Sequence, residues 1–495
     1  MKMITNIMDG VRSLLTPKTI MQNTISSPYV SSEYQTRQKL WRLIYQNKAP
    51  WLIPGKVYSA NIGATLSSEI ARYITINMLA TVRNDITLNT LFQNEVLADI
   101  RNQVEYGLAF GGMIIKPYWT NGVVKITFAQ PNEYELISVD SDGTILECYF
   151  KDYETIYVGG KYEYLVRVEH HLFDRQTGQY KIMNEVYRSD SIGSIDTKYG
   201  NTQAQLQRVP RWQGIQLEQL LSGVTQPMFG YFKPAVSNTI DTKSPYGVSL
   251  FDKAITSLEQ ADKQLSGLVR EFKIKEGKLY VSQLALEGTE RVNKRSGAKL
   301  PHLDDDFYVK LFTDDKQGDT FFEVFSPDIR SEDFLRVFNK YQQLVEDNVG
   351  LMHGTISSPD ITDRTATEVR EAKQKTHATV EANQKALERA FEGALYSMSY
   401  YMGNPQGSWE LITQFDRSLV EDPVETLDQM REDVLSGLLR PELYLAKKYN
   451  ITEEEALKRM PQGTQKIVDN RTKYVWTPVE FGFENGQSPP AQESV

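Results

Sequence analysis

The chain has 495 residues, of which 40% are hydrophobic and 24% are charged, and its formal net charge is −9. This is the composition of a globular protein with a large core. At this length we expect about three domain-sized units. The acidic net charge argues against a general nucleic-acid binder, which usually carries a basic face. The single cysteine, Cys148, excludes a disulfide framework or a cysteine-based zinc site within one chain. The N-terminus has no continuous apolar run, so we expect no signal peptide. No window approaches the length of a membrane span, so we expect none.

The N-terminal third is predicted to be helical and then β-rich. Apolar residues at helical spacing over 62–74 and over 88–104 predict two amphipathic helices. A β-meander is predicted from residue 113 onward, with a strong hairpin signal at Asn121-Gly122. Residues 189–226 are polar and irregular, so we expect a long surface loop there.

The stretch 234–402 carries the clearest pattern, which is helix, insert, helix, loop, helix. One helix is predicted over 249–274 with Ser249 as its N-cap, and a second over 331–350 that ends at Gly350. A loop over 351–364 and a long alanine-rich helix over 365–402 follow. The two apolar stripes that we expect to pack comprise Phe251, Ile255, Leu258 and Leu265 in the first helix and Phe334, Phe338, Tyr341 and Leu344 in the second.

The insert, 277–326, reads as a small α/β unit with three strands. Between the strands lie a basic cluster and then an acidic one, formed by Arg291, Lys294, Arg295 and Lys299 and by Asp304 and Asp305. The basic cluster is either a solvated loop or a contact with DNA or a partner protein. A solvated turn is favoured over a divalent-cation site for the acidic one.

The last part is predicted to contain one strand, over 408–415, and a helical cluster that begins with proline at its first helical position, Pro423. The tail beyond about residue 482 has the composition of a disordered segment.

Sequence motifs for catalysis are absent. There is no phosphate-binding loop, dinucleotide fingerprint, nucleophile elbow or zinc-protease motif. His170 and His171 are neighbours in a predicted strand, so their side chains point to opposite faces and cannot clamp one metal ion together. We therefore expect no enzyme activity, no cofactor and no metal.

An ordered set of segments, none of them specific alone, resembles the portal proteins of tailed bacteriophages, most closely those of siphophages with Gram-positive hosts. The resemblance covers about residues 55–460. The segments are Gly111-Gly-Met-Ile-Ile-Lys-Pro-Tyr-Trp119, Pro227-Met-Phe-Gly-Tyr-Phe-Lys-Pro234, Ser244-Pro-Tyr-Gly-Val-Ser249, Gly354-Thr-Ile-Ser-Ser-Pro359 and Thr365-Ala-Thr-Glu-Val369.

The resemblance implies an α+β subunit with the parts of a portal. These are an unassigned N-terminal arm (1–50), a wing (51–230), a first stem helix region (231–276), a clip (277–326), a second stem helix (327–350), a tunnel loop (351–364), a wing-bridging helix (365–402), a wing strand (403–421), a crown (422–465) and a tail (466–495).

It also implies a ring-shaped homo-oligomer, dodecameric in the virion, that forms the DNA channel at one capsid vertex and is assembled in the host cytoplasm. Such a ring serves genome packaging, retention and ejection and the attachment of the head-tail connector. The implied partners are the major capsid and scaffolding proteins, the terminase large subunit, the head-tail adaptor and double-stranded DNA, with no membrane.

Ring symmetry would turn each charge into a circle of charges around the channel. Duplex DNA carries one negative charge per about 1.7 Å, so a basic lining would hold it, whereas an acidic or neutral lining would let it slide. The residues that we expect to face DNA are Asp347, His353, Thr355, Ser357, Ser358, Asp360 and Asp363. The alternative is that Asp360 and Asp363 only cap turns and the following helix.

Two other classes of protein are alternatives to a portal. A packaging enzyme would need a nucleotide-binding loop or clustered metal carboxylates, which the sequence lacks. Another structural virion or scaffold protein without a channel remains the alternative function.

Overall fold

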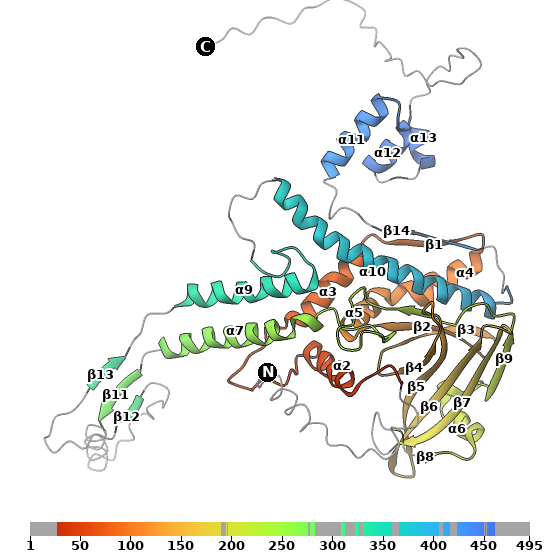
Figure 1. Cartoon of the computed structure of the whole chain (residues 1–495), viewed down its shortest axis with the longest axis horizontal. Helices are drawn as coiled ribbons and strands as arrows, with labels where there is room; N and C mark the ends of the chain where they lie inside the picture. The colour runs from red at the N-terminus through yellow and green to blue at the C-terminus, as the bar shows by residue number, and fades with distance from the viewer. Residues whose placement is uncertain are drawn as a thin grey trace, which may run out of the picture. The chain divides into compact units, whose positions relative to one another are not determined.

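The computed structural model describes residues 27–189, 195, 197–275, 278–282, 308–311, 322–325, 330–358, 366–404, 409–415, 423–449, 451 and 453–460. It has the predicted mixture of helix and sheet (Figure 1). The chain divides into two compact units, Met1–Val420 and Glu421–Val495, which are described separately.

The N-terminal helices of the first unit are α2 (Ser32–Tyr45), α3 (Ile62–Thr75) and α5 (Ile100–Phe110). The helix predicted over 88–104 is interrupted: α4 (Ile86–Leu91) is followed by a π turn and a 3-10 turn before α5 begins. The buried residues of this run recur every four positions, and they are Leu88, Phe92, Val96, Ile100, Val104 and Leu108. A regular α-helix turns every 3.6 residues, so this repeat would drift around it, and the wider π turn absorbs part of the drift.

Two antiparallel sheets follow. The first has the order β10-β2-β3, from β2 (Met113–Thr120), β3 (Val123–Ala129) and β10 (Gly230–Phe232). The second has the order β4-β5-β6-β7-β8, from β4 (Tyr134–Val139), β5 (Ile145–Val158), β6 (Lys161–Asp174), β7 (Gln179–Ser189) and β8 (Thr197–Lys198), and β9 (Glu218–Ser222) also pairs with β7. The β2–β3 hairpin forms where predicted, since Asn121 and Gly122 take φ angles of 50° and 82°, as a two-residue primed turn requires.

The prediction of a surface loop over 189–226 was wrong. This segment contains α6 (Thr202–Arg208), a 3-10 turn (Pro210–Trp212) and β9. Leu206, Val209 and Trp212 are buried with Leu165 of β6 and Val186 of β7 in a small separate core. Three apolar residues in a polar sequence suffice because the sheet supplies the other half of the core.

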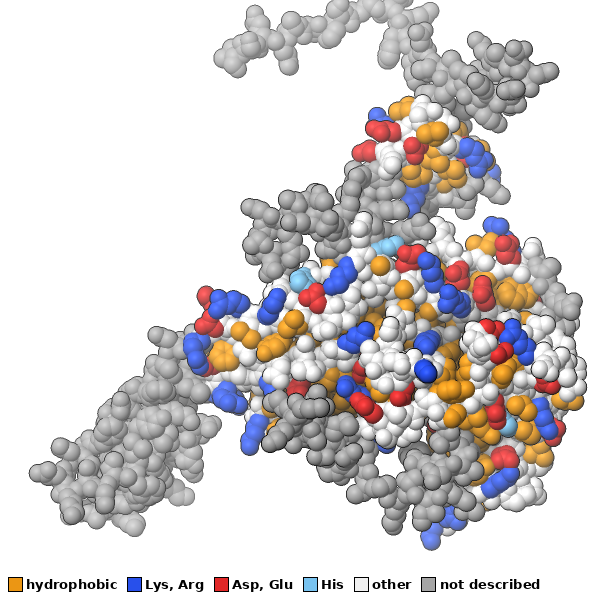
Figure 2. Space-filling model, viewed as in Figure 1, with side chains coloured by type: hydrophobic (Ala, Val, Ile, Leu, Met, Phe, Trp, Pro, Cys, Tyr) orange, Lys and Arg blue, Asp and Glu red, His pale blue; other side chains and the backbone are white. Residues whose placement is uncertain are grey.

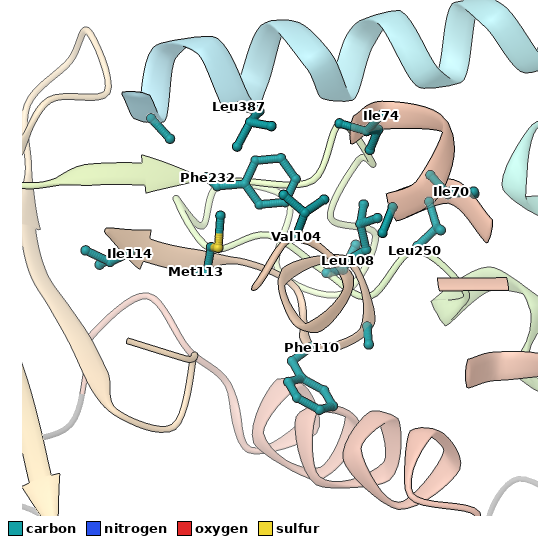
Figure 3. Packing of buried hydrophobic residues seen from close by; sticks show 14 of the residues in the cluster. Ile70, Ile74, Val104, Leu108, Phe110, Met113, Ile114, Phe232, Leu250 and Leu387 are labelled. Carbon is teal, nitrogen blue, oxygen red and sulfur yellow. The ribbon is translucent and has the colours of Figure 1, made fainter. Parts of the chain in front are cut away.

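The main core lies beneath α10 (Ala366–Tyr401), the long helix predicted from the sequence. Figure 3 shows Leu387 of α10 above Phe232 of β10, with Val104 and Leu108 of α5 beside it. β10 passes so close to α10 that a Cβ atom on Gly230 would lie 1.8 Å from the carbonyl oxygen of Ala390. The predicted C-terminal strand, β14 (Glu410–Gln414), pairs with β1 (Leu79–Arg83), a strand that the sequence analysis missed.

Two antiparallel helices, α7 (Ile255–Lys275) and α9 (Ser331–Val349), lead to and from the insert (Figure 1). The prediction of Ser249 as an N-cap was wrong: a 3-10 turn, Asp252–Ala254, precedes α7, and the buried Ser249 hydroxyl has no hydrogen-bond partner. All three predicted strands of the insert are present, as β11 (Lys278–Ser282), β12 (Tyr308–Leu311) and β13 (Phe322–Phe325) in the order β12-β11-β13.

The second unit contains α11 (Pro423–Leu435), α12 (Pro441–Tyr449) and α13 (Glu453–Arg459), as predicted. The first helix begins at the predicted proline, and Gly437, with a φ of 75°, follows its end. A glycine in this conformation is a common way to stop a helix, since it has no Cβ to clash.

Candidate functional site

The loop after α9 begins where the sequence analysis placed it. Gly350 has a φ of 84° and donates its N–H to the carbonyl groups of Glu346 and Asp347, which ends the helix. The Thr379 hydroxyl of α10 donates to the Gly350 carbonyl at 2.8 Å, and the Met352 N–H donates to Thr376 at 2.8 Å. These two contacts fix the start of the loop against α10.

Glu346, on the last turns of α9, organises the rest of the described loop. Its side chain is fully buried, and its Oε1 accepts the N–H groups of Ile356 at 2.7 Å and Ser357 at 2.9 Å. Its Oε2 accepts the Ser357 hydroxyl at 2.8 Å. A carboxylate buried in this way is stabilised by the donors around it. The sequence analysis did not select Glu346, and its only signal was a carboxylate beside the apolar stripe.

Two amides further back on α9 continue this set of contacts. The Gln342 Nε2 donates to the Ile356 carbonyl at 3.1 Å. Asn339 holds both backbone groups of Ser358, accepting its N–H at 2.7 Å and donating to its carbonyl at 3.3 Å. Residues 356–358 therefore run back along α9, antiparallel to it.

Asp347, the next residue on α9, contacts α10 instead of the loop segment 356–358 and forms an ion pair there. Lys375 of α10 donates to its Oδ1 at 2.9 Å, and the His353 Nε2 lies 3.1 Å from the same atom without an aligned hydrogen bond. Burial alone would raise the pKa of Asp347, but Lys375 and His353 outweigh it and hold the pKa below its usual value. Asp347 is therefore ionised at neutral pH and largely compensated by Lys375.

The structure separates the loop residues that were predicted to face DNA. Ser357 is buried, and its hydroxyl also accepts the Gly354 N–H at 2.9 Å, so it does not present a polar group to solvent. Thr355 is half-buried and donates to the Met352 carbonyl, while Ser358 is exposed. Asp360 and Asp363 lie outside the described residues.

The apolar stripes of α7 and α9 pack only in part. Their members nearest the core, Phe251, Ile255 and Leu258, are buried. Leu265, Phe334, Phe338 and Tyr341 are half-buried, where Gly267 lets the Phe334 ring approach α7. Leu344 is 38% exposed, and Phe272 and Leu335 are each 50% exposed. Figure 2 shows hydrophobic side chains on the surface of this helix pair.

Two tryptophans of the N-terminal segment bond to buried carboxylates, one in the 3-10 turn before α7 and one in α7 itself. The Trp41 indole N–H donates to Asp252 at 2.8 Å, and the Trp51 indole N–H donates to Asp262 at 2.8 Å. Burial raises the pKa of both carboxyl groups, while the indole hydrogen bonds act against the rise. The base of the helix pair is therefore held by directional contacts as well as by packing.

The basic and acidic clusters of the insert lie outside the described residues. They comprise Arg291, Lys294, Arg295, Lys299, Asp304 and Asp305. At the end of the helix pair that leads to the insert, lysine and arginine side chains gather beside acidic ones (Figure 2). Arg330 and Arg336 are exposed there and pair with Glu271 and Asp333.

Ionisable groups elsewhere in the first unit are engaged with one another. His170 contacts Glu147, whereas His171 is buried between Glu169 and Tyr180. Glu169 also pairs with the buried Lys116, at the wall of a cavity of about 250 Å³ between β2–β3 and β5–β6. Cys148 is buried, and burial raises the pKa of its thiol, so it has the character of a small apolar residue.

Nowhere among the described residues do three or more histidine, cysteine, aspartate or glutamate side chains gather as a metal ion would require. Of the helices in the same residues, none combines the length and apolarity needed to cross a bilayer.

Comparison with protein families gives one result that spans both units. The family model described as "Phage portal protein, SPP1 Gp6-like" matches residues 60–468. This range runs from just before α3 to beyond α13, so it includes the helix pair, the insert and the loop between α9 and α10. A comparison with curated proteins gave no match.

Proposed function

Because the chain belongs to the SPP1 Gp6-like phage portal protein family, we propose that it forms the ring-shaped channel through which double-stranded DNA enters and leaves one vertex of the capsid. Family membership makes it a portal protein of the virion capsid and implies a homo-oligomeric ring. Packaging, retention and ejection of the genome, and joining of the head-tail connector, are the roles that we assign to the channel. The single observation that carries the proposal is the family match over 60–468.

In this proposal α7 and α9 are the stem of the ring, with about twelve copies around a closed axis. The apolar side chains that one subunit leaves exposed, Phe272, Leu335 and Leu344, would pack on the neighbouring subunit. Burial of apolar side chains of this size against a partner is favourable, because it removes their surface from water. The half-buried stripe between the helices would hold the two stem helices together within each subunit.

The loop over 351–364 would line the channel between the stem and the wing-bridging helix α10. Asp347 would contribute little net charge there, because Lys375 compensates it. A lining that is close to neutral supports sliding of DNA, since a strongly basic one would bind the phosphates through release of counterions. His353, Thr355 and Ser358 are the described loop residues that we assign to the channel side, together with Asp360 and Asp363.

The insert over 277–326 would be the clip. It would meet the terminase large subunit during packaging and the head-tail adaptor afterwards, with Arg291, Lys294, Arg295, Lys299, Asp304 and Asp305 as the charged residues in contact. The wing, 51–230 with 403–421, and the crown, 422–465, would meet the major capsid and scaffolding proteins during assembly in the host cytoplasm. Residues 1–50 and 466–495 are assigned no role.

Two results would separate this proposal from the alternatives. The pure protein should not hydrolyse ATP, because a portal guides DNA while the terminase supplies the work; sustained hydrolysis would favour a packaging enzyme. A structural virion or scaffold protein without a channel would assemble with no central hole, so imaging of the purified protein decides between these two.

A further inference from the structure

We propose that Glu346, Gln342 and Asn339 are positioning residues that hold the loop over 354–358 folded back along α9 and so set how far it reaches into the channel. The part of this inference that concerns the channel rests on the proposed function. The folded-back state itself is a property of one subunit, and it can be measured whether or not a ring forms.

The three side chains lie on one face of α9. Positions 339, 342 and 346 are separated by three and four residues, which places them one above another on a helix. Together they contact the loop at both backbone groups of Ile356, at the N–H and the hydroxyl of Ser357, and at both backbone groups of Ser358. A segment without regular secondary structure thus has its backbone hydrogen bonds supplied by side chains of one helix.

Glu346 is the strongest of the three contacts. It is fully buried, and among the described residues no lysine, arginine or histidine forms an ion pair with it. Its two oxygens therefore have their hydrogen bonds supplied by the loop's own donors, so the loop and this side chain depend on each other. If the loop leaves α9, Glu346 must find water or other donors, which favours the folded-back state over partly detached ones.

The contacts differ in what they demand of the sequence. Asn339 and Gln342 bond to backbone atoms of the loop, so these hydrogen bonds do not depend on the side chains at 356 and 358 unless proline removes the N–H at 358. Glu346, in contrast, accepts a hydrogen bond from the Ser357 hydroxyl, so this contact requires a hydroxyl side chain at 357. The same hydroxyl accepts the Gly354 N–H. Adjacent serines thus have different roles: Ser357 anchors the loop, and Ser358 is exposed and free to face the channel.

Residue-resolved hydrogen–deuterium exchange on the full chain tests the anchor. In the unmodified protein the amides of Gly354, Ile356, Ser357 and Ser358 should be protected. Ser357→Ala should speed exchange at Gly354 and Ser357 by about tenfold or more, because the local opening free energy falls, whereas Ser358→Ala should leave all four unchanged. Exchange of the unmodified loop at the rate of an unstructured peptide, or equal effects of the two alanines, would overturn the proposal.

The helix side of the contact has its own matched pair. Asn339→Ala should release the Ser358 amide and leave Ile356 protected, while Asn348→Ala, which removes an amide that donates to the Leu344 carbonyl within α9, should change neither. Glu346→Gln keeps an oxygen for the two N–H groups and should preserve most of the protection that Glu346→Ala loses. If Glu346→Gln and Glu346→Ala release the loop equally, the carboxylate is not the anchor.

The positioning claim is tested in phage heads. Heads with Ser357→Ala should lose packaged DNA several-fold faster than unmodified heads and heads with Asn348→Ala, as measured by nuclease-sensitive DNA over time. Equal DNA retention despite a released loop would show an anchor with no effect on the channel and would overturn the positioning claim. Failure of the unmodified chain to form rings would instead overturn the proposed function and leave the exchange result standing.

Discussion

Trp41 and Asp252 are joined by a hydrogen bond of 2.8 Å from the indole Nε1 to Oδ1, and Trp51 and Asp262 repeat this contact ten positions further along both segments. In each pair the two residues are 211 positions apart in the sequence. The segment from Trp41 in α2 to Trp51 therefore runs in parallel alongside the segment from Asp252, in the 3-10 turn before α7, to Asp262 in α7, and two indole–carboxylate contacts fix their register.

Removing an indole donor should destabilise the first unit. Trp41→Phe keeps most of the buried ring but removes the indole donor from the buried Asp252 carboxylate, which keeps its ion pair with Arg37 at 3.5 Å; this should cost about 1–3 kcal/mol of unfolding free energy. Trp119→Phe, at a position that is 39% exposed, should change it by less than about 0.5 kcal/mol. Urea unfolding of the two variants measures the difference, and equal effects would contradict the assigned role of Trp41.

Asp252 should also make stability depend on pH in a definite direction. Burial raises its pKa in the folded chain, so the folded state binds the proton more tightly than the unfolded state does. The stability that this proton provides is complete below the unfolded pKa of about 4 and is lost as the pH rises through the folded pKa. Asp252→Asn keeps an acceptor for Trp41 and cannot titrate. The unmodified protein should therefore gain stability relative to this variant as the pH falls toward 4, and a difference that stays constant with pH would refute the prediction.

The crossing of β10 and α10 should tolerate no side chain at Gly230. Gly230→Ala would place a methyl group 1.8 Å from the Ala390 carbonyl oxygen, so backbone must move, at a cost of about 3 kcal/mol or more. Gly200→Ala is the control, because no atom lies within 4 Å of its added Cβ. The two urea midpoints should differ clearly, and similar midpoints would mean that the helix and strand do not pass this closely.

The exposed apolar face of the helix pair should matter for assembly and not for the fold of one subunit. Leu335→Ser, at a position that is 50% exposed, should change the unfolding free energy by less than about 0.5 kcal/mol and should weaken ring formation. Tyr157→Ser, at a position on the β5–β6 hairpin that is 65% exposed, serves as the control for loss of surface apolar area. Sedimentation of both variants gives the comparison, and rings of Leu335→Ser that are as stable as the unmodified ones would remove this face from the interface.

Charge reversal at Asp347 tests the lining of the channel. Asp347→Lys replaces the Asp347–Lys375 ion pair by two positive charges, because Lys375 remains. The resulting basic ring should slow the passage of DNA. Asp347→Asn should have a smaller effect in the same direction. Packaging rates measured in vitro decide the matter, and an unchanged rate with lysine would end the low-friction interpretation.

Periodicity in the sequence was enough to place the long helices, because α7, α9 and α10 each carry a stripe or a composition that no strand would show. It failed where a partner supplies half of the structure: β1 is recognisable only beside β14, and Trp212 is a core residue only beneath β6 and β7. At the loop, the glycine that ends α9 could be predicted from the sequence. The role of Glu346 could not, because its hydrogen-bond donors lie ten and eleven positions later and reach it only through the conformation of the loop.

The native mass of the purified full chain, with negative-stain images of the same fraction, tests the central claim most directly. We predict a closed ring of about twelve subunits with a central hole, because a DNA channel requires cyclic symmetry. A defined dimer or tetramer without a hole would contradict the account.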